Sequence, residues 1–119
     1  MLQLCAVGDI MKINIKTTLN NVNTNEKNSI ETKGILSGDT IVYYDQNIMM
    51  SLDLKERTLK RRSKEYEIIL DFIKNKCFYI MNGNKMMLDI KVNEMDDSFY
   101  VDYEIEDNHI IYSLKYEVL

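Results

Sequence analysis

Hydrophobic and polar residues alternate strictly along much of the chain, which is typical of β-strands that bury one face. The C-terminal segment is the clearest case, because a hydrophobic side chain occupies every second position from Ile110 to Val118. The same period of two runs through residues 11–20, 85–93 and 98–106. Several such segments in a chain of 119 residues predict an all-β fold.

Short turn signals separate these segments and divide the chain into nine or ten strands. Asn82-Gly83 is the strongest signal, because Asn-Gly readily adopts the two positive φ angles of a type I′ hairpin turn. Proline, which would cost a ladder hydrogen bond inside a sheet, is absent. The Asn-rich stretch at 20–28 is expected to be a mobile loop. The predicted strands are residues 11–20, 29–36, 40–45, 48–54, 57–62, 65–73, 76–82, 85–93, 98–106 and 109–118.

Residues 63–76 fit two kinds of secondary structure. The spacing of Tyr66, Ile69 and Ile73 suits one face of a helix, and Ser63 could cap its start. A strand fits as well, because aromatic and β-branched residues dominate and both neighbouring segments resemble strands. We favour the strand.

A meander of this length can leave two long edges exposed or close on itself. Exposed edges invite aggregation, and no predicted helix is available to cover an open sheet. We therefore predict one closed antiparallel up-and-down β-barrel of about 8–10 strands, formed by residues 11–119. Residues 1–10 are assigned to an N-terminal extension, with an extra edge strand as the alternative.

Composition narrows the classes of function. The formal charge of −4 and the pI near 5.0 argue against a dedicated nucleic-acid binder. The two cysteines, Cys5 and Cys77, are too few for the disulfide framework of a small secreted protein, which favours a reducing cytoplasm. No apolar run approaches the ~20 residues of a membrane-spanning helix. We expect a cytoplasmic protein without a membrane partner, and the oligomeric state is left open.

Short motifs extend over residues 12–118. They are Thr32-Lys33-Gly34, Tyr43-Tyr44, Leu59 to Arg62-Ser63, Asn82-Gly83-Asn84 and the closing double hairpin. In these motifs the chain resembles the YwiB-like family of small bacterial calycin-like β-barrels, although Ser63-Lys64 stands where family members tend to carry a glycine. The resemblance implies a barrel related in shape to lipocalins and fatty-acid-binding proteins, in a bacterial cytoplasm. It implies no function, because the family has none assigned.

Residues that catalysis or metal binding would need are missing or isolated. The single histidine, His109, follows a turn and excludes a cluster of imidazole ligands. Cys77 lies in an apolar strand, which favours a buried structural thiol over a Cys–His pair. Asp102 and Glu104 share a strand face whose opposite side is apolar, so a solvated outer surface is favoured over an acid–base pair or a cation site. We expect no enzyme, no cofactor and no metal.

The basic run Lys55–Lys64 is the most local charge feature and contains all three arginines. Alternation places Arg57 and Arg61 on one face of its strand and Arg62 on the other. Unless the strand is bulged or ends early, one arginine must point inward. An inward guanidinium would need a carboxylate partner or an anionic ligand.

The leading hypothesis is therefore a non-enzymatic barrel that binds a small, partly apolar or anionic molecule. The candidate ligand-binding residues are Arg61, Arg62, Tyr43 and Tyr44. Bulky inward residues favour a filled interior, whereas the eight methionines could line an adaptable pocket.

Three other functions fit the sequence less well. The alternative is a protein-interaction module that uses the basic strand 55–64 or the acidic C-terminal hairpins. RNA binding through the same basic strand is less favoured, because few aromatic side chains lie nearby for base stacking. Fatty-acid transport is not supported, since residues 111–116 lack the Arg-x-Tyr of the fatty-acid-binding proteins.

Overall fold

The computed structural model describes residues 10–119, which form ten strands and no helix. Every strand pairs antiparallel with the next one along the chain, and β1 pairs with β10, so the sheet closes into a barrel. The predicted all-β meander barrel is confirmed. The strands are β1 (Ile10–Asn21), β2 (Glu26–Ser37), β3 (Thr40–Asp45), β4 (Ile48–Asp53), β5 (Thr58–Arg62), β6 (Tyr66–Asp71), β7 (Lys76–Met81), β8 (Asn84–Met95), β9 (Phe99–Ile105) and β10 (Asn108–Val118).

The N-terminal extension assigned to residues 1–10 lies outside the described residues, apart from Ile10, which begins β1. Among the residues that the structure describes, none belongs to an apolar helix of membrane-spanning length.

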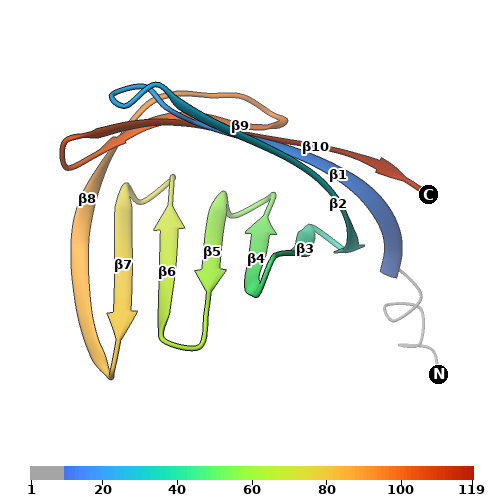
Figure 1. Ribbon diagram of the computed structural model, residues 1–119, viewed down its shortest axis with the longest axis horizontal. Helices are drawn as coiled ribbons and strands as arrows, with labels where there is room; N and C mark the ends of the chain where they lie inside the picture. Colours follow the sequence, from blue (N-terminus) through green and yellow to red (C-terminus); the bar gives the residue numbers. More distant parts are fainter. Residues whose placement is uncertain (1–9) are drawn as a thin grey trace.

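The strands form two crossing groups (Figure 1). Strands β4 to β7 run vertically in this view, while β1, β2, β9 and β10 pass across their upper ends. Strand β8 curves along one side and links the two groups. Its pairing register with β9 shifts between Val92 and Glu94, and such a bulge bends a strand.

The crossing strands are staggered in register, which gives the barrel two unequal ends. Strand β9 pairs only with the second half of β8, from Ile90 onward, so residues 84–89 of β8 extend past β9 and pair with β7 alone. On the opposite side, β3 pairs only with residues 34–37 of β2. The lower ends of β5 to β8 in Figure 1 consequently project beyond the β9–β10 hairpin.

The core occupies the level at which all ten strands enclose the interior. As predicted, every second side chain points inside. Buried residues come from every strand except β6, and Phe72, which directly follows β6, is buried in the core. The ring of Phe72 lies 5.1 Å from that of Tyr103 and 6.2 Å from that of Phe99, measured between centroids. Aromatic side chains therefore fill the centre of the barrel.

Two turn predictions can be compared directly with the structure. Asn82 and Gly83 have φ angles of 50° and 78°, which confirms the type I′ hairpin. The prediction of a mobile loop at 20–28 is wrong, because β1 and β2 form a regular hairpin with a turn at residues 22–25. The side chain of Asn21 makes this turn by accepting hydrogen bonds from the backbone N–H groups of Asn23 and Thr24.

The ambiguous segment 63–76 contains strand β6 and no helix, so the strand prediction is confirmed. Ser63 is a turn residue rather than a helix cap. Its Oγ accepts hydrogen bonds from the N–H groups of Glu65 and Tyr66, at 3.2 and 3.3 Å, and thereby reverses the chain between β5 and β6.

Gly34 marks a close approach inside the barrel. A Cβ atom at this position would lie 2.7 Å from the Val42 carbonyl oxygen and would overlap the side chain of Ile15. We predict that Gly34→Ala lowers the free energy of unfolding by about 1–3 kcal/mol, because the backbone must shift to admit the methyl group. Urea denaturation measures the loss, and Lys33→Ala, at an exposed position on the other face, is the matched control. Equal stability of the two variants would contradict the close approach.

Candidate functional site

The three arginines of the basic run occupy three different environments. Arg57 precedes β5 and has a φ of 58°, so it belongs to a turn rather than to the strand in which the sequence placed it. The Asp53 carboxylate makes this turn by accepting hydrogen bonds from the N–H groups of Lys55 and Glu56. The expectation that Arg57 and Arg61 share one face of a strand is therefore wrong.

Arg57 closes the end of the barrel opposite the projecting strands. Its guanidinium donates hydrogen bonds to the carbonyl oxygens of Asp96 and Ser98. Its Cζ atom lies 5.5 Å from the centre of the Phe99 ring, an arrangement that allows a cation–π interaction. Arg57 thus has a structural role.

Arg62 lies on the outer face of β5. Its Nη2 atom lies 2.8 Å from Oε2 of Glu67, the residue opposite it on β6, and Nε donates to the same oxygen at 2.9 Å. Arg62 therefore forms an ion pair with a carboxylate outside the barrel.

Arg61 lies on the inner face, in register with Met50 on one side and Ile68 on the other. Within residues 10–119 its guanidinium makes no ion pair and no side-chain hydrogen bond. The residue is exposed, because it stands at the rim where the projecting strands end. An inward guanidinium is expected to need a carboxylate partner or an anionic ligand. Because Arg61 is exposed, water hydrates its guanidinium and the cost of burying an unpaired charge does not arise.

Beside Arg61 the interior is closed by two tyrosines. Tyr43 lies opposite Met50, which in turn lies opposite Arg61, and only 3% of Tyr43 is exposed. Its hydroxyl oxygen lies 2.7 Å from that of Tyr112 across the barrel, within hydrogen-bonding distance. Tyr44 points to the opposite side and is 60% exposed. Of the four candidate residues, Arg61 and Tyr43 therefore share the inner face, while Arg62 and Tyr44 lie outside.

Electrostatics places the Arg61 charge near the buried phenols. Burial raises the pKa of Tyr43, and the Arg61 guanidinium opposes this shift. Burial also raises the pKa of Tyr103 well above its usual range, against a smaller lowering by Arg61. Burial raises the pKa of Tyr112 most of all, with a further contribution from its contact with Tyr43. These three phenols are thus uncharged at neutral pH.

Beside Arg61, the inner face of β6 to β8 remains accessible. We call this set of residues the mouth surface; it comprises Arg61, Tyr66, Ile68, Tyr79, Met81 and Met86. They share the inner face by register, and the strands that carry them project beyond β9. Met81 and Met86 are 37% and 54% exposed, and Tyr66, Ile68 and Tyr79 are half-buried. Alternation in the sequence predicts that these residues share one face. It does not predict their exposure, because exposure depends on the stagger between β8 and β9.

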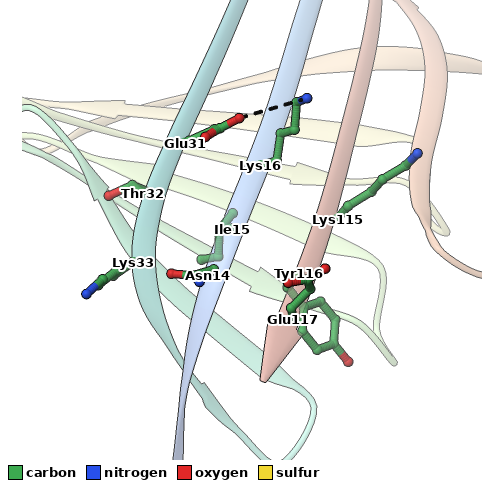
Figure 2. A pocket seen from close by; sticks show the side chains of 9 residues that line it. All are labelled: Asn14, Ile15, Lys16, Glu31, Thr32, Lys33, Lys115, Tyr116 and Glu117. Atoms are coloured by element: carbon green, nitrogen blue, oxygen red, sulfur yellow. Dashed lines mark ion pairs between the residues drawn. The ribbon is translucent and has the colours of Figure 1, made fainter. Parts of the chain in front are cut away.

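A separate hollow lies on the outer surface of β2, β1 and β10 (Figure 2). Its walls carry Lys16, Lys33 and Lys115 together with Glu31 and Glu117. Lys16 points toward Glu31, at 3.9 Å, whereas Lys33 and Lys115 project away on opposite sides. The positive charges do not converge on one point, so this hollow lacks the geometry of an anion site.

His109 is half-buried at the start of β10 rather than an exposed turn residue. Its Nε2 atom lies 2.6 Å from Oδ1 of Asp102, and its backbone N–H donates a hydrogen bond to the side chain of Asn23. These contacts join the β1–β2 and β9–β10 hairpins. Within residues 10–119 no hydroxyl or thiol group is hydrogen-bonded to the imidazole, and no three His, Cys, Asp or Glu residues are grouped to hold a metal.

No family model matches the sequence, and no curated protein matches it. Among solved structures, the chain is similar to the crystal structure of YwiB from Bacillus subtilis, with a TM-score of 0.65 and 14% sequence identity. The match covers 100% of this chain and 99% of that one. The two proteins share a fold. The YwiB-like architecture expected from the short motifs is therefore supported by structure, and at this identity the likeness speaks for the fold alone.

The Tyr43–Tyr112 contact gives a prediction about stability. We expect Tyr112→Phe to lower the free energy of unfolding by about 1–3 kcal/mol, because it leaves the buried Tyr43 hydroxyl without this partner. The double variant Tyr43→Phe/Tyr112→Phe should lose clearly less than the sum of the two single variants. Urea denaturation of the wild type, the two single variants and the double variant completes this double-mutant cycle. Strictly additive losses of unfolding free energy would argue against the hydrogen bond.

The raised tyrosine pKa values also predict how stability depends on pH. The unfolded phenols ionise near the ordinary value of 10.0, whereas burial keeps Tyr43, Tyr103 and Tyr112 protonated to higher pH. Stability should therefore be constant up to about pH 10 and fall as pH rises further, because the unfolded state then binds fewer protons. Unfolding free energies across this range, followed together with tyrosinate absorbance, measure the effect. Stability that stays level above pH 10 would contradict it.

Proposed function

We propose that this protein is a non-enzymatic barrel that binds a small, partly apolar anion at the mouth surface. The observation that carries the proposal is the position of Arg61: its guanidinium is exposed, makes no ion pair within residues 10–119, and stands on the inner face next to accessible apolar side chains. A guanidinium offers five N–H donors in a planar fork that matches a carboxylate or phosphate. Arg61 would hold the anionic group.

The apolar part of the ligand would extend over β6 to β8. Asp45 stands at the rim on β3, on the other side of Arg61, and its negative charge disfavours an anion there. Ile68, Tyr79 and Met86 follow Arg61 in one register row across the neighbouring strands. Methionine side chains are flexible and polarisable, which suits an adaptable contact with an apolar group. The charge therefore lies at one edge of the site and the apolar wall at the other.

We further infer that the chain belongs with the YwiB-like proteins and acts in a bacterial cytoplasm. The full-length structural likeness and the motifs at Thr32–Gly34 and Leu59–Ser63 support the first inference. The low cysteine content supports the second. In this setting the partner would be a small cytosolic metabolite rather than a nucleic acid or a membrane lipid.

A protein partner is the second candidate. It is favoured by exposed apolar side chains on the outer face, where Ile35, Tyr44 and Met87 are 47%, 60% and 57% exposed. The acidic C-terminal hairpins are weaker candidates for such a contact, because Asp102 and Glu104 already accept hydrogen bonds from Asn93.

Removal of the positive charge at Arg61 or at Arg62 separates the two functions. We predict that Arg61→Gln weakens the binding of organic anions about tenfold, since it removes a charge-assisted contact. Arg62→Gln is the matched control, because its guanidinium lies outside the barrel and should leave affinity unchanged. Titration calorimetry with a panel of alkyl and aryl carboxylates provides the measurement.

Native mass spectrometry of the freshly purified protein complements this titration. A retained small acid that is lost from Arg61→Gln supports the ligand function. Equal binding by both variants, or binding of uncharged analogues as tight as that of the acids, would overturn the proposed role of Arg61. One stoichiometric protein recovered by wild type and lost after Tyr44→Glu would favour the second candidate.

A further inference from the structure

Two aromatic rings on the mouth surface lie parallel to each other. The centroids of the Tyr66 and Tyr79 rings are 5.9 Å apart, and their planes differ by 5°. Tyr79 is opposite Ile68 and Tyr66 is opposite Met81, so the two tyrosines are diagonal neighbours on the inner face of β6 and β7. Both rings are half-buried, which leaves part of each accessible. The two rings are stacked on each other and together form an aromatic pair at the accessible end of the barrel.

Arg61 shares the inner face with this pair. Arg61 and Tyr79 flank Ile68 in one register row, so two strand spacings, about 10 Å, separate their Cα atoms. Arg61 and the aromatic pair therefore stand on one face, at a spacing that a small planar acid spans.

The mouth surface favours a rigid ligand over a long flexible one. Next to Arg61 the interior is closed, because Met50 is in register with Arg61, Tyr43 is in register with Met50, and Tyr43, Met50 and Tyr112 are 3%, 9% and 3% exposed. A ligand would therefore lie along the accessible face of the strands rather than inside the barrel. A rigid flat ring loses less conformational entropy on such a face than an acyl chain does.

From this juxtaposition we propose that the ligand is a planar aromatic acid, whose ring packs against the Tyr66–Tyr79 pair and whose carboxylate or phosphate binds Arg61. Offset or edge-on contacts with tyrosine suit such a ring. Met81 and Met86, which lie beside the tyrosines on the same inner face, would cover its edges through sulfur–aromatic contacts. This inference rests on the proposed function and adds the chemical class of the ligand.

Two probes of similar size test it, naphthoate with a flat ring and decanoate with a flexible chain. We expect the full-length protein to bind naphthoate more tightly than decanoate. Tyr79→Leu should weaken naphthoate binding about two- to tenfold, the loss expected for one aromatic contact, while decanoate binding changes little. Phe78→Leu is the matched control, because Phe78 lies on the outer face of the same strand, where it contacts Lys85. Naphthoate fluorescence anisotropy and calorimetry provide the readouts.

The outcomes separate this inference from the proposed function. Decanoate binding that depends on Arg61 and exceeds naphthoate binding would overturn the aromatic class and leave the anion site standing. Failure of both probes to bind in an Arg61-dependent way would overturn both. Equal losses of naphthoate affinity in Tyr79→Leu and Phe78→Leu would assign the effect to the strand rather than to the stack. A circular dichroism spectrum and a melting temperature close to wild type establish that each variant is folded.

Discussion

Closure of the sheet determines the rest of this structure. Because β1 pairs with β10, every strand has two neighbours, and one side chain in two points into a shared interior. A ring of ten short strands is wide, and aliphatic residues alone would leave space at its axis. Phe72, Phe99 and Tyr103 meet there, and the Tyr43–Tyr112 hydrogen bond spans the interior. The tyrosine pair seals the barrel with polar atoms that satisfy each other, so burial of the phenols carries no unpaired group.

A closed ring of unequal strands must also be staggered. Strand β8 has 12 residues, but β9 covers only its second half, so its first half and the neighbouring ends of β5 to β7 continue beyond the enclosed interior. Inner-face residues there keep the alternation of a barrel strand without an opposite wall. Met86 is 54% exposed although it shares the inner face with buried Cys77 and Ile90. The accessible apolar surface is thus a geometric consequence of register rather than a cavity left inside the core.

The alternation of the sequence was sufficient to predict the fold, because period two encodes which face each residue takes. It predicted the inner positions of β1, β8, β9 and β10, the Asn82-Gly83 turn and the strand at β6. It could not predict where strands end. Arg57, Gln46 and Glu106 adopt positive φ angles that are unusual for such residues, and Arg57 does so because Asp53 forms the turn before it. Nor could it predict exposure at Tyr66 or Tyr79, which is set by pairing between distant segments. Of the four candidate residues, alternation alone puts Arg61 and Tyr43 on the inner face and Arg62 and Tyr44 on the outer one.

The arrangement separates the residues that stabilise the barrel from those that would contact a ligand. Arg57 packs on Phe99 at one end of the barrel, and the buried tyrosine pair spans its centre. Arg61 stands one register position from Met50 yet remains in water, so its charge requires no compensating carboxylate from the chain. A guanidinium in that position makes no ion pair within residues 10–119, so a bound anion would displace only its water. Binding there would exclude water from the Arg61 contact and strengthen it, because an apolar ring over Tyr79 lowers the local dielectric. The same inner face that lacks an opposite strand can therefore be completed by a ligand, which would supply the missing apolar cover and pair with the Arg61 guanidinium.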